Sequence, residues 1–170
     1  MPALSTIPVA VQFLLGVFQS SPLLGQASPP VDIINGPSTD VQGNAIPGQT
    51  SSDRAIWVGW SKDPTESGIE IQTSPPSLGG QRDREQYVIH CMAAFINTDS
   101  SIGNMSTAQA TALSVYAAAR EIITLNRNLG GIQGIAKINR GAVTSKQTGT
   151  GARVEVEFDV EVDAFQTYQP

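Results

Sequence analysis

The segment RVEVEFDVEVDA, at residues 153–164, alternates apolar and charged side chains almost without interruption. Successive side chains of a β-strand point to opposite faces of a sheet, so this alternation predicts a strand with one buried and one exposed face. Five hydrophobic residues form the face that covers a core, and five carboxylates form the other. The apolar face holds Val154, Val156, Phe158, Val160 and Val162, and the acidic face holds Glu155, Glu157, Asp159, Glu161 and Asp163.

The acidic face holds five of the fifteen carboxylates of the chain within nine residues. Neighbours on this face lie about 6.6 Å apart, so we expect them to repel one another without local compensation. The simplest interpretation is a solvated sheet face that also discourages aggregation. A calcium site is disfavoured, because side chains two apart on a strand diverge and no Asp- and Gly-rich loop is present to enclose an ion. A third interpretation is the wall of a passage that keeps a polyanion such as DNA from adhering.

Further strands are predicted upstream of this segment, each bounded by Gly, Pro, Asn or Asp residues. Residues 85–96 carry apolar side chains on both faces, which is typical of a central strand. A strand at 132–145 has an expected bulge at Gly141 and ends before a Gly- and Thr-rich turn. Shorter strands are predicted at 31–34, 55–60 and 69–71. Two polar stretches interrupt the pattern, namely a long surface loop at 38–53 and an extended arm or hairpin tip at 74–84.

Two segments have helical spacing of apolar residues. The first covers 7–18, with Ser5 or Thr6 as its cap and Pro8 in the first turn. A secretory signal peptide is the alternative for this segment, but no Lys or Arg precedes Arg54 and the apolar run is too short to span a bilayer. The second, Ala-rich helix is predicted from a cap at Ser106 or Thr107 to Asn126, with the following glycines at 130–131 as its stop.

Composition narrows the functional classes. The chain has 170 residues, a length that suits one domain over 1–170, and a formal charge of −5, which disfavours sequence-specific binding of nucleic acid. His90 and Cys91 are the single histidine and the single cysteine, and as neighbours on a strand they point to opposite faces and cannot act as a nucleophile and base pair. The glycine clusters lack the strand-to-helix context of a phosphate-binding loop. We therefore expect no catalytic residues, metal site or cofactor.

The ordered set of elements resembles the tail terminator proteins of long-tailed bacteriophages, the subunits that cap the tail tube at its head-proximal end. The resemblance covers most of the chain. It rests on the strand that ends in Asn35, Gly36 and Pro37, the strand at 56–60 followed by Asp63, the strand at 84–94, the Ala-rich helix that ends in Leu129, Gly130 and Gly131, and the closing strand at 152–165.

The resemblance implies an α+β fold, a mixed and mostly antiparallel sheet with two main helices packed on one face. It also implies a homo-oligomeric, hexameric ring that ends tube growth and binds the tail tube protein and the head-to-tail connector or stopper, with DNA passing through. The protein would then belong to the virion and assemble in the host cytoplasm, without a membrane. The alternatives are another neck or tail component, such as a stopper or tube subunit, or a secreted binding module.

On this hypothesis the acidic strand faces the channel, and charged residues elsewhere contact the neighbouring subunit or the tube. The candidates lie on the 74–84 arm and on the turn at 144–151. They are Leu78, Arg82, Asp83, Arg84 and Lys146.

Overall fold

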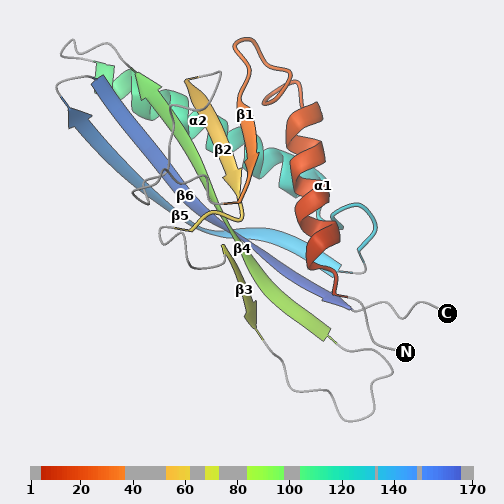
Figure 1. Cartoon of the computed structure of the whole chain (residues 1–170). Helices are drawn as coiled ribbons and strands as arrows, with labels where there is room; N and C mark the ends of the chain where they lie inside the picture. The colour runs from red at the N-terminus through yellow and green to blue at the C-terminus, as the bar shows by residue number, and fades with distance from the viewer. Residues whose placement is uncertain are drawn as a thin grey trace.

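The structure, a computed structural model, describes residues 5–36, 53–61, 68–72, 84–97, 104–132, 134–148 and 151–165. Two helices and six strands follow one another along these residues (Figure 1). In chain order they are α1 (Ile7–Ser20), β1 (Asp32–Asn35), β2 (Arg54–Val58), β3 (Ile69–Gln72), β4 (Arg84–Asn97), α2 (Asn104–Leu125), β5 (Gly134–Thr148) and β6 (Gly151–Phe165).

The two long strands β4 and β6 form the centre of a single sheet. They pair antiparallel over fourteen positions, from Arg84 opposite Phe165 to Asn97 opposite Ala152. Strand β5 pairs antiparallel with the other side of β6, and β2 and β3 both pair antiparallel with the other side of β4. Strand β1 pairs parallel with β2. The predicted α+β fold with a mixed, mostly antiparallel sheet is confirmed.

Strands β2 and β3 lie end to end along the same side of β4. Residues 54–58 pair with the second half of β4, and residues 69–72 pair with the first half. The two strands meet where Gly68 touches the backbone of Gly59, so closely that a Cβ atom on Gly68 would lie 2.0 Å from the Gly59 carbonyl oxygen. Glycine at this junction therefore lets one edge of the sheet continue from β2 into β3.

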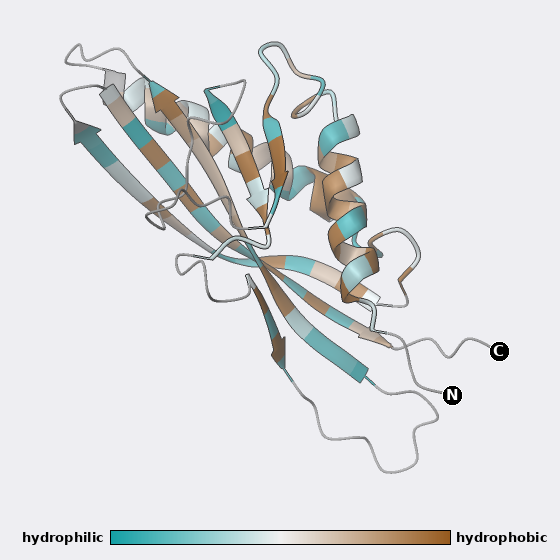
Figure 2. Cartoon of the chain, in the orientation of Figure 1, coloured by the Kyte–Doolittle hydropathy of each residue, from teal (hydrophilic) through white to brown (hydrophobic). Residues whose placement is uncertain are grey.

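Both helices cover the same face of this sheet, as predicted. The alternation of β6, visible as brown and teal bands in Figure 2, directs its five apolar side chains into that layer. Helix α1 contributes the fully buried Ala10, Leu14 and Phe18, which confirms the prediction of a buried helix over 7–18. Helix α2 contributes small residues that let it approach the strands closely; Ala108, Ala112 and Ala119 are fully buried.

A smaller apolar cluster lies on the opposite face of the sheet, which we call the open face. It consists of Ala55 and Trp57 from β2 and Met92 and Ala94 from β4, all buried. Strand β4 therefore carries buried side chains on both faces, and β6 and β2 flank it. Its predicted central position is confirmed.

Two predicted boundaries were wrong. Helix α2 begins at Asn104, so Ser106 and Thr107 lie inside its first turn and do not precede it. Strand β5 extends to Thr148, because its pairing with β6 continues to Gly151 and places Lys146 in the strand. The bulge is confirmed, since the register between β5 and β6 shifts between Ile138 and Gly141.

The start of α1 is fixed by a carboxylate from the start of β4. Glu85, only 8% exposed, accepts hydrogen bonds at 2.7 Å from the backbone N–H of Thr6, at 2.8 Å from the Thr6 hydroxyl and at 2.7 Å from the Ser5 hydroxyl. Thr6 is the residue that precedes the helix, but its side chain does not cap the helix itself. Glu85 thus plays the part that a glutamate of the helix plays in a capping box, and its charge favours the positive end of the helix dipole.

We expect Glu85→Ala to lower the free energy of unfolding by about 2–3 kcal/mol, because it removes a charged acceptor and leaves buried donors without a partner. Urea denaturation followed by circular dichroism measures this loss. As a control, Glu121→Ala removes an exposed carboxylate of α2 and should change stability by no more than about 0.5 kcal/mol. Equal stability of the Glu85 variant and the wild type would show that α1 is not held at this point.

Candidate functional site

The five carboxylates of β6 all lie on the open face and are partly exposed. Their neighbours on this face come from even-numbered positions of β4 and from β5. The sheet register therefore decides which side chains can reach each carboxylate. The row formed by Glu155, Glu157, Asp159, Glu161 and Asp163 is called the acidic row below.

Asp163 lies at one end of the acidic row and is bound by Arg84 from β4. The Arg84 guanidinium donates two hydrogen bonds to the carboxylate, the one from Nε at 2.7 Å, and Gln86 Nε2 donates another at 3.3 Å. The hydrogen bond from Arg84 lowers the pKa of Asp163 below its ordinary value, and the same contact raises the pKa of Arg84. Asp163 therefore remains charged in mildly acidic solution.

Glu161 is held by residues from β5. Lys137 Nζ lies 3.0 Å from its carboxylate, and Asn139 donates a second hydrogen bond to it. The contact with Lys137 lowers the pKa of Glu161, and Arg140 adds to this effect by its charge. The bulge in β5 lies next to this point, between Ile138 and Gly141.

The rest of the row is also partnered. Asp159 lies directly opposite His90, whose Nδ1 is 2.7 Å from the carboxylate oxygen. Glu155 receives a hydrogen bond from Arg153 of its own strand, and Glu157 is not free of interactions either. The expectation that these carboxylates repel one another without local compensation was therefore wrong.

The reason for this error is that compensation comes from other strands. Lys137 and Arg84 are far from residues 155–163 in sequence, and only the pairings β4–β6 and β5–β6 bring them alongside. A sequence pattern gives the face of a residue but not the register of its neighbours. The one signal available was Arg153, which stands two positions before Glu155 and therefore shares its face.

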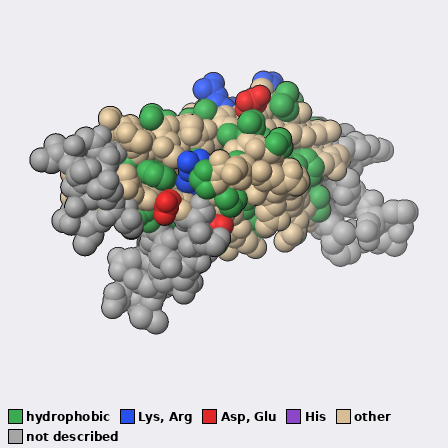
Figure 3. Space-filling model, turned by 90° about the horizontal axis from the view of Figure 1, so that it is seen from above, with side chains coloured by type: hydrophobic (Ala, Val, Ile, Leu, Met, Phe, Trp, Pro, Cys, Tyr) green, Lys and Arg blue, Asp and Glu red, His purple; other side chains and the backbone are tan. Residues whose placement is uncertain are grey.

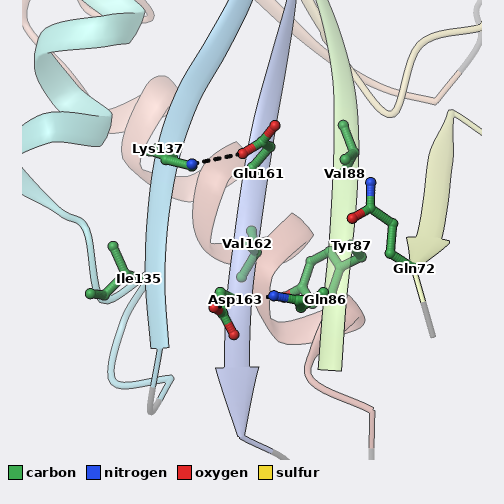
Figure 4. Close-up of a pocket in the computed structure, with 9 residues that line it drawn as sticks. All are labelled: Gln72, Gln86, Tyr87, Val88, Ile135, Lys137, Glu161, Val162 and Asp163. Atoms are coloured by element: carbon green, nitrogen blue, oxygen red, sulfur yellow. Dashed lines mark hydrogen bonds and ion pairs between the residues drawn. The ribbon is translucent and has the colours of Figure 1, made fainter. Parts of the chain in front are cut away.

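A groove of about 310 Å³ opens at the lower end of this face, between β3 and β5 (Figure 4). Lys137 and Glu161 form its ion pair, and Gln72 and Gln86 add amide groups from the β3 side. Val88, Ile135 and Asp163, which stand on the same face, complete the wall. The lining residues are Gln72, Gln86, Tyr87, Val88, Ile135, Lys137, Glu161, Val162 and Asp163. The groove could therefore form hydrogen bonds with a polar group through its amides and its ion pair.

The side chains of His90 and Cys91 point to opposite faces of the sheet, as the strand pattern predicts. Cys91 points into the layer under the helices, where burial raises its pKa to about 12, and His90 points to the open face. The two side chains therefore lie on opposite sides of the sheet. Cys91 is buried in the core, whereas the side chain of His90 is partly exposed. The described part of the chain contains no group of three or more His, Cys, Asp or Glu side chains that could hold a metal ion.

The predicted interface residues have different outcomes. Arg84 is the first residue of β4 and binds Asp163, so the prediction that it belongs to a projecting arm was wrong. Lys146 is exposed on β5 and makes no ion pair with a described residue. Leu78, Arg82 and Asp83, like the remainder of the 74–83 arm and the loop at 38–52, lie outside the described residues.

Charges of both signs also occur together on the molecular surface. In the view of Figure 3, acidic and basic side chains lie close to one another among apolar and uncharged groups. No helix within the described ranges is long and apolar enough to cross a membrane. Comparison of the sequence with known protein families finds no matching family, and comparison with curated proteins finds no significant relative.

The ion pairs of the acidic row predict a dependence of stability on pH. Because Asp163 has a lower pKa in the folded protein than its value of about 3.9 in an unfolded chain, its contribution is present above pH 4 and is lost as the pH falls through the folded pKa. In Arg84→Gln we expect the titration midpoint of the Asp163 carboxyl group, measured by NMR, to rise toward the unfolded value.

Lys146→Gln is the matched control, since Lys146 forms no ion pair with a described carboxylate. It should leave the Asp163 midpoint unchanged. An unaltered midpoint in the Arg84 variant would contradict the assigned ion pair.

Proposed function

We propose that this protein is a structural virion subunit that forms a homo-oligomeric ring at the head-proximal end of a phage tail tube. In that role it ends tube growth, joins the tail to the head-side connector and lets DNA pass through its centre. It would assemble in the host cytoplasm, act without a cofactor and catalyse no reaction. The proposal rests on the resemblance carried by the ordered sequence elements and on one structural observation.

That observation is the two-sided character of the sheet. Both helices cover one face (Figure 1), while the other face carries the acidic row and a polar groove. In a ring built with the helices outward, the open face would border the central passage. A wall of this kind needs to be hydrated and needs to lack unpaired cations that would bind phosphate groups.

The open face is not purely negative, because it also carries cations. These cations suit such a wall because they are paired with carboxylates. The cations Arg84, Lys137 and Arg153 each lie in an ion pair with a carboxylate of the row. Their charge is therefore already satisfied, so a passing polyanion gains little by contacting them. The acidic excess of the row supplies weak repulsion, so DNA would adhere little to this part of the face. Lys146 is the exception, because it is exposed and makes no ion pair with a described residue.

A tube subunit or a head-to-tail stopper would share the ring and the polar passage, whereas a secreted binding module would need neither. Native mass spectrometry of the purified protein, alone and mixed with the tail tube protein of the same genome, separates these alternatives. We expect a closed oligomer, or a monomer that joins the tube end and halts tube growth. A protein that polymerises alone into long tubes is a tube subunit, and a monomer that ignores the tube contradicts the proposal.

A further inference from the structure

The outer side of β5 is a free sheet edge along much of its length. Strand β5 pairs with β6 on its inner side and with no described strand on its outer side. Near its start the outer side is occupied, since the Ala136 N–H donates a hydrogen bond of 2.8 Å to the Arg127 carbonyl. Residues 140–147 are all exposed, and no described backbone group bonds to their outer side. Their outward N–H and C=O groups are therefore available to another strand.

An apolar strip, formed by Leu113 and Val143, lies on the helix side of this edge. Helix α2 runs along β5 in the opposite direction, as two contacts show. They are a hydrogen bond of 3.0 Å from Gln109 to Ser145 and the approach of Tyr116 to Gly141. Leu113 and Val143 lie between these contacts in sequence and are 42% and 50% exposed. An added strand would therefore bury apolar side chains against this strip.

The open-face side of the same edge is cationic. Lys146 lies directly opposite Arg153 of β6, and Arg153 is already bound to Glu155. Arg140 acts by its charge on the pKa of Glu161, which places it near the same face. Neither Arg140 nor Lys146 forms an ion pair with a described residue, and β5 contains no acidic residue. A carboxylate on the outer side of Lys146 would relieve the like charges that face each other there.

The two sides of the edge together define the strand that fits it. Side chains alternate between the faces of a sheet, so apolar residues toward the helices and carboxylates toward the open face require an alternating sequence. Strand β6 shows that β5 accepts this pattern, because on the inner side Val156 pairs with Val143 and Glu155 pairs with Thr144. The outer edge presents the same two faces and adds free cations.

A second copy of the chain does not supply such a strand from its described elements. Strand β6 has the pattern, but β4 and β5 occupy both of its sides. Strand β5 would bring the same cations to its own counterpart and no carboxylate. Strand β3 carries a single carboxylate in four residues, and its Ile69 already has an interaction partner. The complementary strand is therefore expected from a different protein.

We propose that the outer edge of β5 docks an extended segment of a different protein, in which apolar residues alternate with Asp or Glu. The segment adds one strand to the sheet. Backbone hydrogen bonds to residues 140–147 hold it, while Lys146 and the apolar strip select its sequence. This contact goes beyond the proposed ring. In the virion the donor would be a protein that adjoins the ring, but the chemistry of the edge does not depend on that role.

A synthetic peptide tests the docking directly. The probe is a labelled, capped peptide of about nine residues in which Val alternates with Glu, and its counterpart has Lys in place of Glu. Fluorescence anisotropy with the full-length protein should show binding of the Glu peptide and not of the Lys peptide. Lys146→Glu should weaken binding of the Glu peptide about tenfold, because it sets like charges together. Gln12→Glu, which adds the same charge to the exposed surface of α1, is the control and should leave the affinity unchanged.

Methylation of the peptide nitrogens separates strand pairing from attraction between charges. A strand bonds to one neighbour through alternate N–H groups. Methylating one alternate set in the Glu peptide should therefore abolish binding, whereas methylating the other set should leave binding largely intact. If both methylated peptides bind as the parent does, the contact is made by charges alone and the proposed strand addition is wrong.

The remaining outcomes are distinct. Failure of the Glu peptide to bind at its highest soluble concentration, or equal binding of the Lys peptide, contradicts the proposal. Binding of duplex DNA that Lys146→Glu removes, without peptide binding, would make the edge a phosphate contact. Self-association that Lys146→Glu abolishes in analytical ultracentrifugation would make a second copy the occupant. Each of these results overturns the docking proposal and leaves the ring to its own test, whereas a protein that forms no ring should still bind the Glu peptide.

Discussion

The antiparallel pairing of β4 with β6 is the interaction on which the remainder of the structure depends. It extends over fourteen positions and sends the apolar half of β6 under the helices and the acidic half to the open face. Because side chains alternate, a slip of one residue would turn all five carboxylates toward Leu14, Phe18 and Ala112. The cost of burying unpaired charges makes that register inaccessible. Hydrophobic alternation in a single segment thus fixes the position of both helices, and Glu85, at the start of β4, ties α1 to the end of the same pair of strands.

The same pairing also determines the electrostatics of the open face. It places His90 opposite Asp159 and brings Arg84 within reach of Asp163, while β5 contributes Lys137 on the other side. A row that looks strongly repulsive in sequence is therefore largely partnered. Arg84, His90 and Lys137 come from neighbouring strands, and Arg153 comes from the same strand. Such exposed pairs contribute little to stability, but they leave few free cations for a polyanion to bind. The proposed passage for DNA depends on this balance more than on negative charge alone. Lys146 is the exception, since the residue opposite it is another cation.

Much of the fold could be predicted from residue patterns, because they depend on local periodicity. The alternation of β6, the buried face of α1 and the central position of β4 are all visible in sequence. The bulge next to Gly141 could also be predicted from the sequence, since glycine interrupts a strand pattern there. What sequence could not provide is the pairing of distant segments. The carboxylate that caps α1 comes from a residue 79 positions away, and the cations beside the acidic row come from β4 and β5. The extension of β5 to Thr148 likewise depends on its long partner and not on its own polar residues.

Amide hydrogen exchange most directly tests whether β4 and β6 form the stable centre of the sheet while the outer side of β5 is open. We expect the amides of residues 154–162 in β6 to exchange slowest, at rates set by global unfolding, in monomer and assembly alike. Outward-facing amides of residues 140–147 in β5, which no described backbone group covers, should exchange rapidly. Slow exchange along β5 in the monomer, or rapid exchange in β6, would contradict the account.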